Sequence, residues 1–320
     1  MRNNIKYITG VLFFILLLSG PAFGAFNQLD YSARSVGMGN VFVAVADDSS
    51  ALFANPSGIG NMKSWEVQLS YNKLVIGTGD DIGENYLGVV YPMKNYGSLG
   101  FSWYTFGDTV YSETVYQLAY AYSALNSSFG VNVKYLSNAF AANDWTNINP
   151  YFSSLSKNVF SFGVSFCSRF FNDFTVGFFM DDFNSPDIGL STEERLPVTL
   201  KGGVSYRQKD TLVAIEIISR ANLTKFQVGG EINGFKAGDL GLMSFRLGAG
   251  FGDGSYFNIC AGTGLKFNIP LVGAGCSFDY GFMLPTAFAD GTAGTHKFTL
   301  TFTELYNLKD DKLNPEGGLK

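Results

Sequence analysis

The 320-residue chain is rich in glycine and aromatic residues and poor in charge, with 38 glycines, 16% aromatic and 15% charged residues. Soluble domains usually carry about 25% charged residues, and a soluble β-sandwich would need more charge on its outward face than this composition offers. The 27 acidic residues outnumber the 22 basic ones, which argues against a nucleic-acid partner.

The first 24 residues have the pattern of a cleaved signal peptide. Arg2 and Lys6 precede the apolar run 7–18, and small residues lead to an expected cut after Gly24. The run is shorter than the roughly 20 residues of a membrane-spanning helix. We therefore expect residues 1–24 to be removed and the mature chain to be exported.

The mature chain alternates apolar with small or polar residues, which indicates strands with one apolar face. Phe160, Phe162 and Val164, for example, alternate with Ser161 and Gly163. No later apolar run approaches the length of a spanning helix. The alternation predicts about fourteen strands, near residues 65–72, 85–93, 96–106, 115–124, 127–137, 158–168, 173–181, 196–207, 210–219, 224–232, 243–252, 256–267, 271–280 and 295–305.

Short, polar turns alternate with longer links between these strands, as in outer-membrane barrels with periplasmic turns and extracellular loops. Two links fit poorly, because 233–242 is long where a turn is expected and 253–255 is short where a loop is expected. The predicted fold is all-β, a transmembrane antiparallel β-barrel over residues 65–305 in the outer membrane. Residues 306–320 are charged and are expected to be a disordered periplasmic tail.

About fourteen strands should enclose a lumen too wide to be filled by their side chains alone. Residues 25–64 precede the first strand and are the natural segment to fill it. Charges of both signs are expected on the lumen face and should form salt bridges with that segment. These residues are Glu66, Lys134, Lys201, Glu216, Lys225, Glu231, Arg246, Lys266 and Asp279.

Residues 33–60, ARSVGMGNVFVAVADDSSALFANPSGIG, form the most specific motif of the chain. The glycines permit tight turns, 41–45 can form a short extended piece, and 47–49 offer caps for a brief helix that Pro56 ends. The motif resembles the N-terminal hatch of FadL-like outer-membrane barrels, most closely the PorV/PorQ group, with Ser57 where alanine is common. The matching residues are Arg34, Gly37, Met38, Gly39, Asp47, Asp48, Asn55, Pro56 and Gly58.

The resemblance implies a fourteen-stranded barrel with a hatch in its lumen, and two different functions. A FadL-like channel takes up hydrophobic or amphipathic small molecules passively, and here the hatch would gate it. The alternative is a PorV/PorQ-like component of type IX secretion that binds and escorts secreted protein cargo. The remaining expected partners are outer-membrane lipids and, during insertion, the barrel-assembly machinery.

Enzymatic functions find no support in the sequence. The single histidine, His296, stands at the start of the last predicted strand, where a catalytic triad would need further groups around it. The glycine runs 248–252 and 262–264 lack the spacing of a dinucleotide loop and are better explained as small lumen-facing residues. We therefore expect no catalysis, no cofactor and no metal site.

Overall fold

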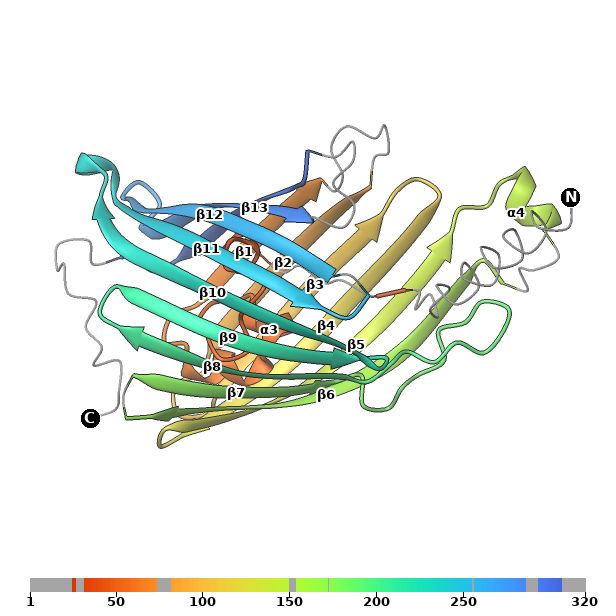
Figure 1. The fold of residues 1–320 in the computed structure, drawn as a ribbon, viewed down its shortest axis with the longest axis horizontal. Helices are drawn as coiled ribbons and strands as arrows, with labels where there is room; N and C mark the ends of the chain where they lie inside the picture. The colour runs from red at the N-terminus through yellow and green to blue at the C-terminus, as the bar shows by residue number, and fades with distance from the viewer. Residues whose placement is uncertain are drawn as a thin grey trace, which may run out of the picture.

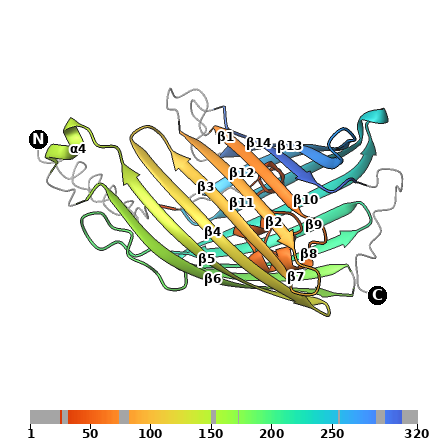
Figure 2. The same cartoon turned by 180° about the vertical axis from the view of Figure 1, so that it is seen from behind.

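The computed structural model describes residues 25–26, 32–73, 82–149, 154–171, 173–254, 256–285 and 293–306. The predicted signal peptide, and all but the first residue of the predicted tail, lie outside the described residues. The strands form a closed antiparallel barrel in which each pairs with its neighbours in sequence and β1 pairs with β14 (Figures 1 and 2). In the part of the chain that the structure describes, no helix is long and apolar enough to cross a membrane.

Fourteen strands form the wall, and each overlaps its predicted range, so the predicted strand number is confirmed. The strands are β1 (Glu66–Lys73), β2 (Gly83–Pro92), β3 (Ser98–Gly107), β4 (Tyr111–Ala124), β5 (Ser127–Phe140), β6 (Ser156–Phe170), β7 (Phe174–Asp181), β8 (Thr199–Gln208), β9 (Thr211–Arg220), β10 (Leu223–Lys236), β11 (Leu242–Gly252), β12 (Tyr256–Ile269), β13 (Ala274–Pro285) and β14 (Thr295–Thr303). The short helices are α2 (Ala33–Gly37), α3 (Ala51–Ala54), α4 (Asp144–Ile148) and the 3-10 helices η1 (Pro56–Asn61) and η2 (Gly238–Leu240).

Side chains alternate between the two faces of the wall, because successive strand residues point to opposite sides. On β5 and β6, the paired residues Val133 and Phe162 point outward and are 42% and 37% exposed. The neighbouring pair, Lys134 and Ser161, points inward and is buried. An apolar outer face and a polar inner face are the arrangement that suits a barrel in a bilayer.

The two ends of the barrel differ in their connections. We call the end with the β2–β3, β4–β5 and β12–β13 connections the turn end (left in Figure 1), and the opposite end the loop end. The β10–β11 connection at the turn end is shorter than predicted, because β10 continues past a bulge between Ile232 and Phe235 to Lys236. At the loop end, β9 and β10 are joined by Ala221 and Asn222 alone.

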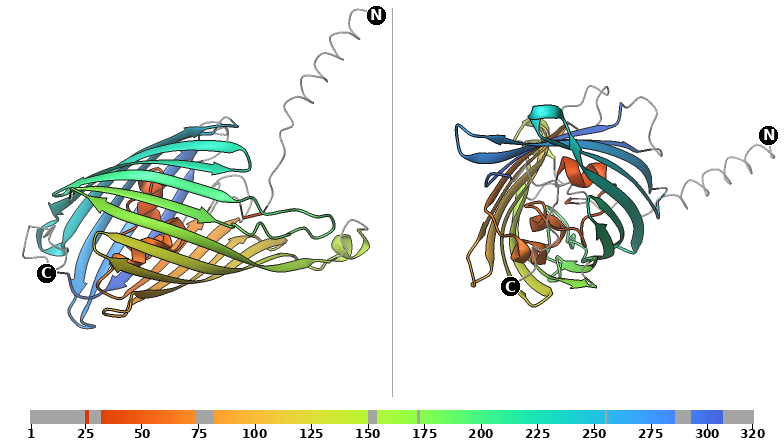
Figure 3. Two further views of the ribbon diagram at one scale, coloured as in Figure 1. Left: turned by 90° about the horizontal axis from the view of Figure 1, so that it is seen from below. Right: turned by 90° about the vertical axis from the view of Figure 1, so that its left-hand side faces the viewer.

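Residues 32–65, here the N-terminal segment, lie inside the barrel (Figure 3). Helix α2 packs against β11–β14, whereas η1 packs against β3–β6 on another side of the wall. Between the two, the ring of Phe53 lies 5.8 Å from that of Tyr86 and 6.0 Å from that of Tyr104, centroid to centroid. The segment therefore contacts the inner wall on two sides.

Candidate functional site: the polar network inside the barrel

Helix α2 begins with a capping box that also fixes it to the wall. The hydroxyl of Ser32 accepts a hydrogen bond from the Ser35 N–H at 3.2 Å, and the Ser35 hydroxyl accepts one from the Ser32 N–H at 3.3 Å. Such reciprocal bonds satisfy amides that have no partner within a helix. The Ala33 N–H donates to the hydroxyl of Thr299 on β14 at 2.8 Å, so the wall supplies the next partner.

The Gly-Met-Gly part of the motif lies too close to the wall for a larger residue at either glycine. A Cβ on Gly37 would lie 2.9 Å from the Cα of Gly262 on β12. Gly39 has a φ of 74°, which glycine tolerates best, and a Cβ there would lie 2.9 Å from the Ala249 backbone nitrogen. Met38 between them is fully buried. The two glycines thus allow the close approach of α2 to β11 and β12.

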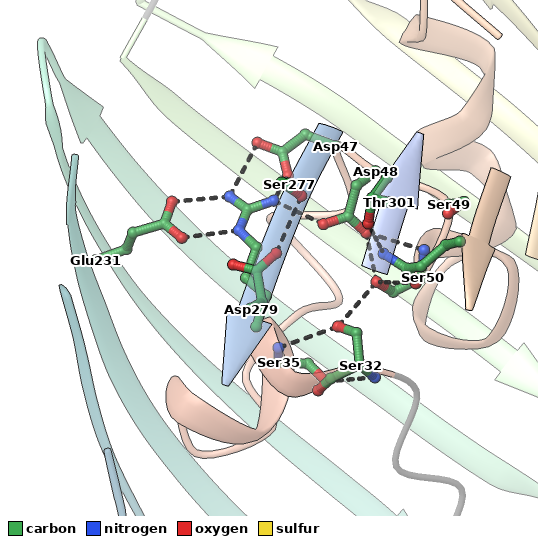
Figure 4. A network of polar contacts seen from close by, with 12 residues as sticks. Ser32, Ser35, Asp47, Asp48, Ser49, Ser50, Glu231, Ser277, Asp279 and Thr301 are labelled. Carbon is green, nitrogen blue, oxygen red and sulfur yellow. Dashed lines mark hydrogen bonds and ion pairs between the residues drawn. The ribbon is translucent and has the colours of Figure 1, made fainter. Parts of the chain in front are cut away.

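Arg34 of α2 is the centre of an ion-pair network with Asp47, Asp48 and Glu231 (Figure 4). Its Nε and Nη2 donate to the two carboxylate oxygens of Glu231 on β10, each at 2.8 Å. Its Nη1 donates to Asp47 at 2.6 Å and to Asp48 at 2.8 Å. One side chain thereby joins two parts of the N-terminal segment to the barrel wall.

Arg246 on β11 extends the network along the wall. Its Nε donates to Glu231 at 2.6 Å, and its Nη1 donates to Asp279 on β13 at 2.7 Å. The side chains of Glu231 and Arg246 are each 1% exposed. Because a buried charge that loses its partner stays uncompensated, removal of one member of such a network costs about 3–5 kcal/mol.

Asp47 is held in its charged form by two arginines. Burial raises the pKa of this carboxyl, but the charges of Arg34 and Arg207 outweigh that effect and lower the pKa to about 2. Arg207 on β8 donates to the second carboxylate oxygen at 2.5 Å. Burial likewise lowers the pKa of Arg34, whereas Asp47, Glu231 and Asp48 raise it well above its usual value. Arg34 and Asp47 are therefore both ionised at neutral pH.

Residues 41–45 form a turn, so the extended piece predicted there is wrong. The Ala46 N–H donates to the Phe42 carbonyl at 3.0 Å and closes this turn. The carboxylate of Glu216 on β9 accepts the N–H groups of Phe42 and Val43 at 2.7 and 2.8 Å. A wall side chain thus takes the place of the neighbouring strand that these backbone amides would otherwise need.

The Asn-Pro-Ser-Gly turn attaches the end of the motif to β6. The side-chain oxygen of Asn55 accepts the Ser57 N–H at 3.2 Å and its hydroxyl at 2.6 Å. The Ser57 N–H also donates to the hydroxyl of Ser165 on β6 at 2.8 Å. Pro56 starts η1, where its missing N–H needs no partner. A Cβ on Gly58 would lie 2.1 Å from a carbonyl oxygen of the same segment.

The predicted lumen residues divide into two groups by burial. Those that point inward and are buried are Lys134, Lys201, Glu216, Glu231, Arg246 and Asp279. Glu66, Lys225 and Lys266 are half-buried. Glu66 accepts the Ser49 N–H at 2.6 Å, and the two lysines lie over tyrosine rings, with Nζ 4.3 and 5.7 Å from the ring centroids.

Sequence reasoning missed three further buried ion pairs on the inner face. Lys134 Nζ lies 2.6 Å from Asp181 and 2.7 Å from Asp182, and Lys297 Nζ lies 2.9 Å from Glu84. Asp182 and Glu84 stand one residue outside the predicted strands, so the alternation was read too short to include them. Extending the predicted strand 85–93 by one residue, with the same alternation, would have placed Glu84 on the inner face.

The described residues nearest the N-terminus, 25–26, are also held by charged wall residues, near the loop end. The Phe26 N–H donates to the carboxylate of Glu113 on β4 at 2.7 Å. Arg220 on β9 donates to the Phe26 carbonyl at 2.7 Å. The Phe26 side chain is buried in an apolar cluster that includes Tyr104 and Leu212. Two facing parts of the wall thus bind one short piece of backbone.

Metal-binding arrangements find no counterpart in the described ranges. No three His, Cys, Asp or Glu side chains among these residues lie close enough to hold a metal ion. His296 lies on the outer face of β14, where its Nδ1 is 2.8 Å from the hydroxyl of Tyr280. Many polar groups inside the barrel, among them Glu216, Glu231 and Thr299, bind the N-terminal segment.

Comparisons with known proteins agree on an outer-membrane barrel. The model of the family "Type IX secretion system membrane protein PorP/SprF" matches residues 49–302. A FadL homologue of Pseudomonas aeruginosa has a TM-score of 0.58 at 13% identity, covering 85% of this chain and 98% of that one. The monoaromatic hydrocarbon channel CymD has a TM-score of 0.60 at 11% identity, covering 88% and 99%. A deltaS2 mutant of the monoaromatic hydrocarbon channel TodX has a TM-score of 0.56 at 9% identity, covering 88% of this chain and 100% of that one.

At these identities the structural likeness shows the fold, and the predicted FadL-like fold is confirmed. None of the curated proteins matches this chain. The narrower resemblance to the PorV/PorQ group stays a prediction. Both the family and the fold are those of a channel or secretion component, which agrees with the expectation that the protein is not an enzyme.

Proposed function

We propose a role for this chain in type IX secretion, since it belongs to the family of type IX secretion system membrane proteins PorP/SprF. In this role it is an outer-membrane barrel that is closed by its own N-terminal hatch. In this role the barrel binds secreted cargo or another component of the system at its ends and outer face, and its lumen conducts nothing. A PorV/PorQ-like escort of cargo is one form of this role. The family assignment favours it over the uptake channel.

The observation that carries the proposal is the attachment of the segment to many strands by polar contacts, several of them buried. Arg34 reaches β10, Asp47 reaches β8 through Arg207, and Ser57 reaches β6. Backbone groups of the same segment bind Glu216 on β9. A segment that moved aside in every transport cycle would have to break these contacts together, at a cost of several kcal/mol. We therefore infer a hatch that stays in place.

A hydrophobic uptake channel is the second candidate, and one observation favours it. An apolar cluster fills part of the lumen, where Phe26, Phe42 and Phe53 of the N-terminal chain meet Tyr86 and Tyr104 of the wall. If these phenylalanines withdrew, the space left would be lined by apolar and aromatic side chains, as ligand pockets for hydrophobic molecules are. The fold likeness to monoaromatic hydrocarbon channels supports the same substrate class.

Deletion of the gene separates the two candidates. In a cell that uses type IX secretion, loss of this barrel should leave secreted cargo in the periplasm, and the wild-type gene should restore export. Uptake of a monoaromatic hydrocarbon, measured in the same strains, should not change. Normal export together with lost uptake would contradict the secretion role and support the channel.

A further inference from the structure

Large apolar side chains stand at the tips of the turn-end connections, where the sequence predicts polar turns. Tyr96 is 75% exposed, Leu125 88%, Phe171 90%, Leu240 71% and Leu271 94%. They belong to five of the six turn-end connections, β2–β3, β4–β5, β6–β7, β10–β11 and β12–β13; the sixth, β8–β9, carries Lys209 and Asp210 instead. Their regular placement at one end indicates a rim that contacts an apolar phase.

The backbone of these turns does not require apolar residues. Leu125 and Phe171 adopt φ values of 55° and 49°, a conformation that asparagine and glycine favour and bulky residues rarely adopt. Lys209 at the same end and Ala221 at the loop end have nearly the same φ, 51° and 53°, in connections of the same kind. The leucine and the phenylalanine are therefore present in spite of the local conformation, which points to a role for their side chains.

Basic residues accompany the apolar tips. Among the described residues, the exposed basic ones of the turn end are Lys63, Lys94, Arg169, Lys209 and Lys236, against the exposed acidic residues Asp239 and Glu304. The described part of the loop end has the opposite balance, with exposed Asp108, Asp144, Glu193, Glu194 and Asp253 against Arg195. Apolar and aromatic tips with neighbouring lysine or arginine are the composition of a surface that binds a phospholipid interface.

The rim is also continuous with the apolar outer face of the barrel. Phe170 and Phe174, which flank the Phe171 turn, point outward and are 48% and 43% exposed. The hydroxyl of Tyr120 on the outer face of β4 donates to the carbonyl of Tyr96, so outer face and tip are in contact. A bilayer that covers the outer face therefore reaches the tips.

We propose that the turn end is a membrane-binding rim, in which the apolar tips insert into the interfacial layer of a phospholipid leaflet and the basic side chains bind its phosphate groups. The rim fixes the depth and tilt of the barrel in the bilayer. It acts independently of the hatch, since none of its tips belongs to the N-terminal segment.

Tryptophan fluorescence tests the insertion. In a background with Trp65, Trp103 and Trp145 replaced by phenylalanine, single-tryptophan variants Leu125→Trp and Phe171→Trp are folded into vesicles of phospholipids brominated near the top of the acyl chain. Both should emit at short wavelength and be quenched as strongly as a Phe170→Trp variant on the outer face. Asp253→Trp, in a polar loop-end connection, should emit as in water and be quenched weakly.

Emission of the Leu125→Trp and Phe171→Trp variants at the wavelength of Asp253→Trp, without quenching, would overturn the proposal and leave these tips for a protein partner. The charge contribution has its own test. Lys94→Gln with Arg169→Gln should weaken binding of the folded rim to phosphatidylglycerol, seen as a longer emission wavelength at Phe171→Trp in such vesicles. An unchanged wavelength would show that the basic residues do not bind the phosphates.

Discussion

Arg34 of α2 and Glu231 of β10, 197 positions apart in the chain, form a bidentate ion pair with both N–O distances at 2.8 Å. Two parallel bonds between a guanidinium and a carboxylate fix orientation as well as distance. The same carboxylate binds Arg246, so the position of α2 depends on the register of β10 and β11. In the proposed role, this pair holds the hatch against the wall.

Glu231→Gln should therefore destabilise the protein strongly. The change leaves Arg34 and Arg246 without their shared carboxylate, and about 3–5 kcal/mol of the free energy of unfolding should be lost. Unfolding by denaturant in lipid vesicles measures this loss. The matched control is Glu193→Gln, whose exposed pair with Arg195 should contribute at most about 1 kcal/mol. Equal effects of the two variants would contradict a structural role for the buried network.

Acid should weaken the attachment of the N-terminal segment through Asp47. Its pKa in the folded protein is about 2, below the ordinary value of 3.8, so its ion pairs stabilise the folded state fully above pH 4. This contribution should disappear as the pH falls from about 4 to about 2. The stability difference between wild type and Asp47→Asn, measured across this range, should shrink toward zero at the acid end. A difference that does not change with pH would show that Asp47 is not paired.

The close approach of α2 to the wall predicts an unequal response of two glycines. Gly37→Ala places a Cβ 2.9 Å from the Gly262 backbone and should cost about 1–3 kcal/mol of stability, as overpacking does. Gly202→Ala on β8 is the control, because the nearest atom to its Cβ would be 3.9 Å away. Thermal unfolding of both variants provides the comparison. A neutral Gly37→Ala would mean that α2 lies farther from the wall.

Arginine substitutions distinguish a filled lumen from an open one. Val133→Arg, facing lipid, should cost about 2–4 kcal/mol near the bilayer midplane. A water-filled lumen would accept Ser161→Arg, but the Ser161 hydroxyl donates to Asp182 at 2.5 Å and the side chain is fully buried. This variant should therefore also lose stability, by about 1–3 kcal/mol. Folding yields in vesicles, with Val133→Ile as the conservative control, decide between a filled and an open lumen: a Ser161→Arg variant that folds as well as the control would indicate an open one.

The strands could be predicted because their signal is local. Each strand carries its own alternation of apolar and small or polar residues, as the run from Phe160 to Val164 does. The alternation arises because every strand crosses the same bilayer with one face toward lipid and one toward the lumen. Strand ends were less accurate, because the alternation continues past the bilayer into residues such as Glu84 and Glu113, which face the interior at the loop end.

The interior contacts depend on pairings that no local pattern contains. The motif singles out Arg34 and Asp47 as functional residues. It does not identify their partners, Glu231 and Arg207, because these depend on the strand register and on the position of the segment in the lumen. The apolar tips were missed for a different reason. Turn preferences favour polar residues, and a requirement for contact with lipid can override them at positions such as Leu125.

The conductance of the barrel with and without residues 26–60 tests the central claim most directly. Planar bilayers that contain the wild-type protein should show almost no current, because in the proposed role the N-terminal segment closes the lumen. Deletion of these residues should produce a steady open pore, with gel mobility and circular dichroism confirming that the barrel is still folded and inserted. A folded deletion variant with the same low conductance as wild type would contradict the account, since something other than the N-terminal segment would then close the barrel.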